Sequence, residues 1–242
     1  MSHYLRFLSL VVGSLLAGSF SSPSYAWYDR THMAVVEAAG APGLSYLAVG
    51  ADMAKEKAAN ERFNHYSNNP HGTVITVKTV LDQAVLYNST APDSGHLYGA
   101  IIAALDTYRE RKKDPTRYAL YPLGYAMHYL GDLSMPFHNI DYNAFNKANH
   151  AGNDDVVNGE PRLVSEIHSR MGKYATKINP LKFRESLVTH VAQLANRSTL
   201  LGYQLQGNGT VVMNKDTAYE QLAQSAALLR AILVALDLPV SP

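Results

Sequence analysis

The stretch that decides the fold class is YPLGYAMHYLGDLSMPFHN, residues 121–139. Its periodicity predicts a helix, and Pro136 predicts the end of that helix because proline cannot continue the backbone hydrogen bonding. His128 and Asp132 stand four positions apart. A helix therefore places both side chains on one face, one turn apart. His138 follows in the exit segment and can reach back toward the same face.

This His–Asp pair has two interpretations. Imidazole and carboxylate ligands without thiolate suit a zinc ion. A hydrogen bond between the two side chains in a polar patch is the simpler alternative, because an isolated H-x-x-x-D pattern is short and common. The other histidines of the chain are needed to choose between the two.

The rest of the chain also has helical periodicity, interrupted by Gly, Pro and Asn, with little of the alternation expected of strands. Thr31 is the expected N-cap of a first helix that stops at Gly40 and Pro42. Leu222, Ala226 and Leu229 belong to a core-facing stripe on the last helix. The further expected helices cover 43–60, 73–88, 94–113, 116–134, 160–177, 180–205 and 214–237, and the expected loops cover 64–72, 136–159 and 206–213. These patterns predict an all-α, single-domain multi-helix bundle.

Composition excludes several classes of protein. The 242 residues are 47% hydrophobic and 17% charged, which is globular and excludes disordered and fibrous chains. No cysteine is present, so disulfides and thiolate-bound metals are excluded. A formal net charge of +1 gives no reason to expect electrostatic capture of DNA or of an anionic membrane.

Residues 1–26 have the layout of a secretory signal peptide: Arg6, then an apolar stretch over 8–20, then small residues. The apolar stretch is too short to cross a bilayer, which takes about 20 residues. Cleavage is expected after Ala26, which leaves residues 27–242 as the mature domain. We therefore expect a secreted or periplasmic protein.

More histidines and acids follow the same pattern elsewhere in the chain. His150 and Asp154 repeat the H-x-x-x-D spacing, although Asp155 is a competing carboxylate and a polar surface loop is the alternative. His32, Asp52 and His65 lie in three further short segments. An all-α bundle can bring all these segments together around metal ions.

At this point the sequence resembles a known family. The segment MHYLGDLSMPFH and the position of Trp27, which would become the first residue after cleavage, resemble the zinc-dependent phospholipase C family. That family shares an all-α fold and a three-zinc site with the zinc-dependent single-strand nucleases. The resemblance covers residues 27 to about 155 by motif, and the remainder only by helical character.

The resemblance implies three zinc ions per chain and assigns their ligands. Trp27, through its new amino group and its carbonyl oxygen, would share one zinc with His32. Asp132 would bridge that zinc to a second one. The resemblance completes the second zinc with Asp52, His65 and His128, and gives the third His138, His150 and Asp154.

The implied function is that of a secreted phospholipase C. Such an enzyme hydrolyses the glycerol-side phosphodiester bond of phosphatidylcholine-like lipids to diacylglycerol and a phosphorylated headgroup. Asp154 in place of a glutamate, and the short spacing from Trp27 to His32, resemble the nucleases instead. The missing cysteines, the shorter chain and the HYLGD segment favour the phospholipase. A single-strand nuclease or phosphomonoesterase is the alternative, and a non-catalytic zinc-binding helical protein is the third hypothesis.

Roles around the metals follow from the same reading. Asp52 is expected to be a ligand, a general base on the attacking water, or both. Asp29, Phe63 and Tyr66 lie next to proposed ligands and suit a choline headgroup through Coulomb attraction and cation–π contact. The expected partner is phospholipid at a membrane surface; no protein partner is implied, and nucleic acid is expected only under the alternative. The remaining mature-chain histidines, expected to be structural or exposed, are His71, His96, His168 and His190, of which His168 is the reserve ligand.

Overall fold

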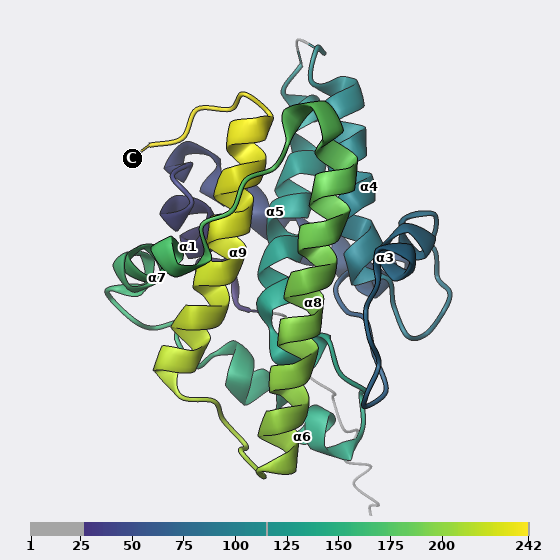
Figure 1. Cartoon of the computed structure of the whole chain (residues 1–242), viewed down its shortest axis with the longest axis vertical. Helices are drawn as coiled ribbons and strands as arrows, with labels where there is room; N and C mark the ends of the chain where they lie inside the picture. Colours follow the sequence, from purple (N-terminus) through teal and green to yellow (C-terminus); the bar gives the residue numbers. More distant parts are fainter. Residues whose placement is uncertain (1–26, 115, 242) are drawn as a thin grey trace, which may run out of the picture.

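The computed structural model describes residues 27–114 and 116–241, so the expected signal peptide lies outside the described residues. Within these ranges the fold is all-α: no strand forms, and a single isolated bridge joins Ser67 to Gly95. The helices of the described ranges are α1 (Asp29–Ala38), α2 (Gly50–Lys55), α3 (Val77–Ala84), α4 (Leu97–Arg111), α5 (Leu120–Ser134), α6 (Ala144–Asp154), α7 (Leu163–Met171), α8 (Phe183–Gly207) and α9 (Lys215–Ala235). The predicted fold class is confirmed (Figure 1).

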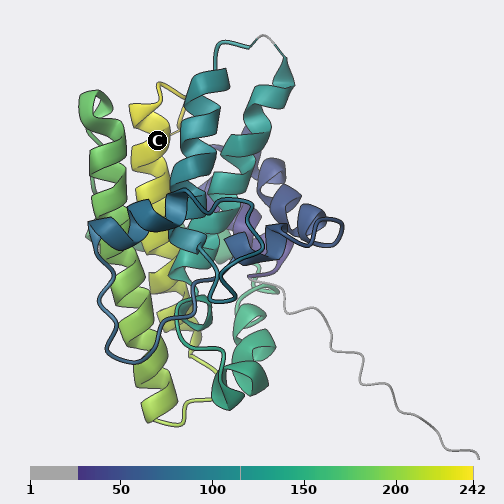
Figure 2. The same cartoon turned by 90° about the vertical axis from the view of Figure 1, so that its right-hand side faces the viewer.

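Helix α5 lies at the centre of the molecule. The long helices α4, α8 and α9 run beside it, and α1 packs against it from another side (Figure 1). Figure 2 shows α3 crossing the long helices, while α6 lies at the end of the molecule where α8 ends. Helix α5, which carries His128 and Asp132, therefore has helices packed against several of its sides.

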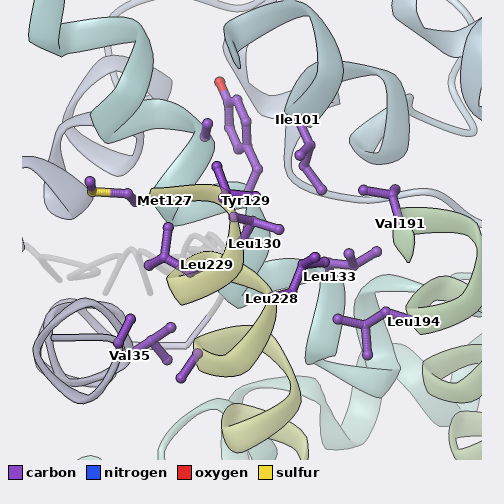
Figure 3. Packing of buried hydrophobic residues seen from close by; sticks show 14 of the residues in the cluster. Val35, Ile101, Met127, Tyr129, Leu130, Leu133, Val191, Leu194, Leu228 and Leu229 are labelled. Carbon is purple, nitrogen blue, oxygen red and sulfur yellow. The ribbon is translucent and has the colours of Figure 1, made fainter. Parts of the chain in front are cut away.

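The hydrophobic core forms where these helices meet. Figure 3 shows Val35 of α1, Leu130 of α5, Val191 of α8 and Leu229 of α9 directed into one cluster. All four side chains are fully buried. Burying an aliphatic side chain contributes roughly 1.5–3 kcal/mol, so this cluster fixes α5 firmly. The chemistry-bearing face of α5 is thus held by packing on its other faces.

The first two expected helices differ from prediction. Thr31 is not the N-cap, because α1 already begins at Asp29 and Thr31 is buried inside its first turn. The expected helix over 43–60 is instead a 3-10 helix, Pro42–Val49, followed by the short α2. The proline and glycine of this region favour tight turns, which broke the long helix into two pieces.

The expected loop over 136–159 is the largest correction. A 3-10 turn, Pro136–His138, follows α5, and helix α6 occupies Ala144–Asp154. Asn143 caps α6, because its side chain accepts a hydrogen bond from the backbone N–H of Asn146 at 3.1 Å. The abundant asparagines that suggested a loop are therefore a cap and inward-facing helix residues.

The long helices agree more closely with prediction. Asn214 caps α9 by accepting from the backbone N–H of Thr217 at 2.8 Å, and α9 presents its expected stripe to the core. The helices expected over 94–113, 116–134 and 180–205 form within a few residues of those limits. Among the described residues, none of the helices combines the length and apolarity needed to cross a membrane.

Candidate metal centre

Helix α5 presents His128 and Asp132 on one buried face. His128 Nε2 lies 3.4 Å from Asp132 Oδ2, and both side chains are fully buried. Two ligands held by one zinc at about 2.0–2.1 Å in tetrahedral geometry would be about 3.4 Å apart. The pair predicted from the four-residue spacing therefore has the separation of two ligands of one metal ion.

Helix α1 brings His32 onto the same face. The His32 ring stacks on the His128 ring, with centroids 3.7 Å apart. This close approach requires Gly131, since a Cβ atom at that position would lie 2.5 Å from His32 Nδ1. His32 Nε2 lies 3.4 Å from Asp132 Oδ1. The glycine between the two α5 residues thus makes room for the third one.

Asp132 faces two sides of the site. Its Oδ1 points toward His32, whereas its Oδ2 lies 3.1 Å from His65 Nδ1. His65 follows a 3-10 turn, Glu61–Asn64, that leads away from α2. A carboxylate with one oxygen on each of two ligand sets has the arrangement of a bridging ligand.

Asp52 of α2 completes this part of the site. Asp52 Oδ1 lies 3.6 Å from His128 Nε2 and 3.7 Å from His65 Nδ1. The same oxygen forms an ion pair with Lys55 Nζ at 2.6 Å. Asp52, one of the predicted ligands, therefore lies with the histidines and beside the cation Lys55.

Another group of possible ligands forms at the C-terminal end of α5. His138, in the turn after α5, lies edge-on to His150 of α6, with ring centroids 4.7 Å apart. His150 Nε2 lies 3.5 Å from Asp154 Oδ2, one turn along α6. Asp154 is buried and Asp155 is exposed, so Asp154 is the carboxylate that faces the histidines.

The ligand atoms of these residues fall into three groups, each within 4.8 Å. We name them the His32 cluster (His32, Asp52, His128), the His65 cluster (His65, His128, Asp132) and the His138 cluster (His138, His150, Asp154). The ligand sets implied by the family resemblance grouped His32 with Asp132 and Trp27, whereas the geometry also brings Asp52 and His128 within range of His32. Three buried His/Asp clusters of this kind could hold metal ions.

Buried polar atoms without a hydrogen-bond partner indicate whether the clusters suit a cation. Buried polar atoms are normally hydrogen-bonded, and an unpaired one costs about 1–3 kcal/mol. Here no hydrogen-bond partner exists among the described residues for a set of buried atoms that point into the clusters. They are His32 Nε2, Asp52 Oδ2, Asp132 Oδ1, His138 Nε2, His150 Nε2 and both carboxylate oxygens of Asp154. Nearly all are acceptors in their metal-binding form, so a divalent cation would supply the partner that they lack.

The other ring nitrogens fix the tautomers. The Nδ1–H of His128 donates to the Ala48 carbonyl at 2.7 Å, and the Nδ1–H of His138 donates to the His65 carbonyl at 2.5 Å. His150 donates in the same way to Asn146 Oδ1 at 3.0 Å. Each bond leaves the Nε2 lone pair directed into a cluster, as metal-binding histidines require.

His65 is held in the opposite sense, by residues that the sequence reading missed. It presents Nδ1 to the cluster, and its Nε2 lies 3.5 Å from Glu61 Oε1. Glu61 is 4% exposed and accepts hydrogen bonds from the Tyr129 hydroxyl and from Asn64 Nδ2. The only sequence signal for Glu61 was its position one helical turn before His65.

Burial and charge set the protonation of the metal-free site. Burial, assisted by His128, lowers the pKa of His32 to about 3. Burial also opposes charge on His128, but Asp132 and Asp52 outweigh it and raise the pKa of His128 to about 9. Burial, followed by repulsion from Asp132, raises the pKa of Asp154 well above its usual range. A bound cation would favour the ionised carboxylate instead, since opposite charge stabilises the charged form.

Two cavities open onto the clusters. One, of about 640 Å³, is lined by His65, His138 and His150, and therefore reaches two clusters. The other, of about 540 Å³, is lined by Asp52 and Asp29. The ligands themselves are at most 6% exposed, so each cavity meets only their edges. Small molecules can therefore reach a site whose ligands are fixed by the fold.

The remaining predicted site residues have different surroundings. Tyr66 lines the larger of these two cavities and Asp29 the smaller one. Phe63 is 3% exposed and lines neither. The Trp27 side chain is buried in the core. A zinc-binding role for its amino group after cleavage remains a prediction.

His168 does not join the clusters. Its Nδ1 hydrogen bonds to the Ala38 carbonyl at 3.1 Å, and the side chain lines a separate cavity against α9. His96 bonds to Asn64 Oδ1 at 2.8 Å, and His71 packs edge-on against Tyr203. His190 lies near the Thr176 hydroxyl. These four histidines have ordinary structural partners, as expected.

In comparisons with known proteins, no family model, curated protein or solved structure matches the chain. Any assignment of activity therefore depends on the residues of the site and on the motifs of the sequence.

Proposed function

We propose that this protein is a secreted, zinc-dependent phospholipase C that binds three zinc ions. The observation that carries the proposal is the set of buried, unpaired nitrogen and oxygen atoms directed into three adjacent clusters. Imidazole and carboxylate donors without thiolate suit zinc. The family resemblance supplies the reaction: hydrolysis of the glycerol-side phosphodiester bond to diacylglycerol and a phosphorylated headgroup.

Asp132 and Asp52 would have different roles in such a reaction. Bound zinc ions would lower the pKa of water and neutralise charge on the phosphoryl oxygens. Asp132 directs Oδ1 toward His32 and Oδ2 toward His65, so it would contribute a ligand to two ions. Asp52 Oδ1 lies 3.7 Å from Nδ1 of His65, which lines the cavity of about 640 Å³, and Asp52 would accept a proton from the attacking water. Burial opposes its ionisation, but His128 and Lys55 outweigh burial and lower the pKa of Asp52 to about 2, which keeps it ionised at neutral pH.

A single-strand nuclease is the second candidate, and one observation favours it. The cavity of about 640 Å³ combines cations with Tyr66 and Tyr142, of which Tyr142 is 47% exposed. Exposed aromatic rings beside cations are the elements that bind single-stranded nucleic acid. A purely structural or storage role is less favoured, because closed structural zinc sites do not open onto cavities.

The test is an assay of the mature chain, residues 27–242, after zinc loading. The phospholipase proposal predicts release of diacylglycerol from phospholipid, abolished by a chelator and restored by zinc. Cleavage of single-stranded DNA without lipid hydrolysis would favour the nuclease. Bound zinc without either activity would leave the non-catalytic metal-binding protein.

A further inference from the structure

The cavity of about 640 Å³ that reaches two clusters has a charge that bears on the substrate. We propose that it selects phospholipids whose headgroup carries hydroxyl groups and no cation, such as phosphatidylglycerol, over phosphatidylcholine. This inference rests on the proposed phospholipase function and names its substrate class. We call this cavity the headgroup cavity. Its lining includes Lys55, Arg62, Tyr66, Asn68, Asp93 and Tyr142.

The headgroup cavity is the one that the scissile phosphate would occupy. It is lined by His65 of the His65 cluster and by His138 and His150 of the His138 cluster. The smaller cavity is lined by only one cluster residue, Asp52. A phosphate held between two clusters therefore places the attached headgroup among the walls of the headgroup cavity.

Those walls are cationic. Lys55 and Arg62 line the cavity, and Asp93 is the one carboxylate among its lining residues. Lys55 already contacts the ligand Asp52 at 2.6 Å, so its charge is close to the metal centre. The two cations outnumber the single carboxylate of the lining, so a cationic headgroup is repelled there. A quaternary ammonium group in this cavity meets that repulsion, whereas a glycerol headgroup does not.

The Phe63 ring, which the sequence suggested for choline binding, is already covered. Cation–π binding requires a free ring face. The Arg62 guanidinium lies 4.6 Å from the centroid of the Phe63 ring. The His96 ring is nearly parallel to the same ring, at 6.5 Å and 12°. Phe63 is 3% exposed, so choline finds no open face there.

The other walls suit hydroxyl groups. Tyr66 and Tyr142 present phenol groups, and Asn68 an amide, which both donate and accept hydrogen bonds. Gly95 has φ +74°, and a Cβ there would lie 2.6 Å from a Tyr66 ring carbon. The close packing of this glycine fixes the Tyr66 ring in the wall. A polyhydroxylated headgroup therefore finds ordered partners in place of an ion pair.

The test compares the zinc-loaded mature chain on dihexanoyl-phosphatidylglycerol and dihexanoyl-phosphatidylcholine. Both are used below their critical micelle concentrations, so that surface charge plays no part. We expect kcat/KM to be about tenfold higher for the glycerol lipid, a difference of about 1.4 kcal/mol. Arg62→Gln should bring the two values together, mainly by raising kcat/KM for the choline lipid.

Arg109→Gln is the matched control. Arg109 also lies over a phenylalanine ring, that of Phe183 at 4.8 Å, but is absent from the headgroup cavity. This variant should keep the preference of the unchanged protein. A second readout is calorimetric binding of glycerol 1-phosphate and phosphocholine to the zinc-loaded protein, which should follow the same order.

The outcomes separate the inference from the function beneath it. Equal or faster hydrolysis of the choline lipid, or an unchanged preference in Arg62→Gln, would overturn the headgroup assignment and leave the phospholipase intact. Hydrolysis of neither lipid by the zinc-loaded chain would overturn the phospholipase proposal, and the headgroup assignment with it.

Discussion

Asp52 is the residue whose proposed role depends most on its exact surroundings. It lies within 3.7 Å of two histidine nitrogens and 2.6 Å from Lys55, and it borders a cavity. A carboxylate with a pKa of about 2 is a good ligand and a weak base. Its contribution to proton transfer therefore depends on position more than on basicity.

Substitution Asp52→Asn tests that role. The amide keeps the shape but cannot accept the proton, so turnover should fall by about 10²–10⁴-fold. Most of the zinc should stay bound, because the histidines of the His32 cluster and the His65 cluster remain. Asp155→Asn, an exposed neighbour of a ligand, is the control and should retain full activity. An active Asp52→Asn enzyme would remove the proton-accepting role.

Glu61 gives a prediction about metal affinity. Its carboxylate lies 3.5 Å from His65 Nε2 and is itself held by Tyr129 and Asn64. Carboxylates placed behind metal-binding histidines typically change metal affinity by about 10–100-fold when mutated. Glu61→Gln should therefore weaken zinc binding by that factor in a chelator competition, whereas Glu185→Gln on the exposed start of α8 should not. Equal affinities in the two variants would mean that Glu61 has only a packing role.

His32 makes the stability of the metal-free protein depend on pH. Its folded pKa of about 3 lies below the ordinary value of 6.5, so the unfolded chain binds this proton more readily. The contribution of His32 to stability is therefore complete above pH 6.5 and is lost as the pH falls toward 3. Between pH 6 and 5, His32→Asn should reduce the slope of unfolding free energy against pH by up to about 1.4 kcal/mol per pH unit. Denaturant titrations of the chelator-treated proteins would measure it, and an unchanged slope would contradict it.

At the scale of the elements, the contact of α1 with α5 decides whether the His32 cluster forms. Gly131 allows the His32 ring to lie against α5, because a Cβ there would approach its Nδ1 to 2.5 Å. Helix propensity alone favours alanine over glycine by about 1 kcal/mol. Gly131 therefore lowers the stability of the helix but permits the contact with His32.

Gly131→Ala should reverse the usual effect of a helical Gly→Ala change. We expect a loss of about 1–3 kcal/mol in unfolding free energy from overpacking, together with fewer bound metal ions. Gly152→Ala on α6 is the matched control, since the nearest atom to its Cβ would be 3.7 Å away. That variant should be neutral or slightly more stable. Equal behaviour of the two alanine variants would show that His32 is not held through Gly131.

The elements also show what sequence could predict. The i, i+4 spacing placed His128 and Asp132 correctly, because α5 is a regular helix with an apolar face and a proline end. Helix α6 was missed because its buried face consists of Asn146, His150, Asn153 and Asp154 instead of apolar residues. Asn146 is buried because its amide donates to the Phe137 carbonyl at 2.8 Å. Hydrophobic periodicity cannot detect a helix that is held by such bonds.

The support around His65 could not be predicted for a related reason. Glu61 and Tyr129 are 68 positions apart, and their hydrogen bond exists only once α5 packs beside the turn that precedes His65. Sequence alone gave Glu61 no partner. Contacts between distant segments require the packed bundle, whereas ligand pairs within one helix do not.

At the scale of the whole molecule, metal ions in the clusters would join segments that the core does not join alone. The clusters tie α1, α2, α5, α6 and the two 3-10 turns to one another. The chain has no cysteine, so no disulfide provides that link. Metal-binding free energy is also folding free energy when the site exists only in the folded chain. Metal ions bound in these clusters would in this way also stabilise the fold.

The central claim is that the three buried clusters hold zinc, and the most direct measurement is the metal content of the purified mature chain. After dialysis against metal-free buffer, elemental analysis should find about three zinc ions per chain. His138→Ala should lower that number by about one through loss of a ligand from the His138 cluster, while His190→Ala, outside the clusters, should not change it. A zinc content near zero in chain that had been purified without chelator and folded correctly would contradict the account.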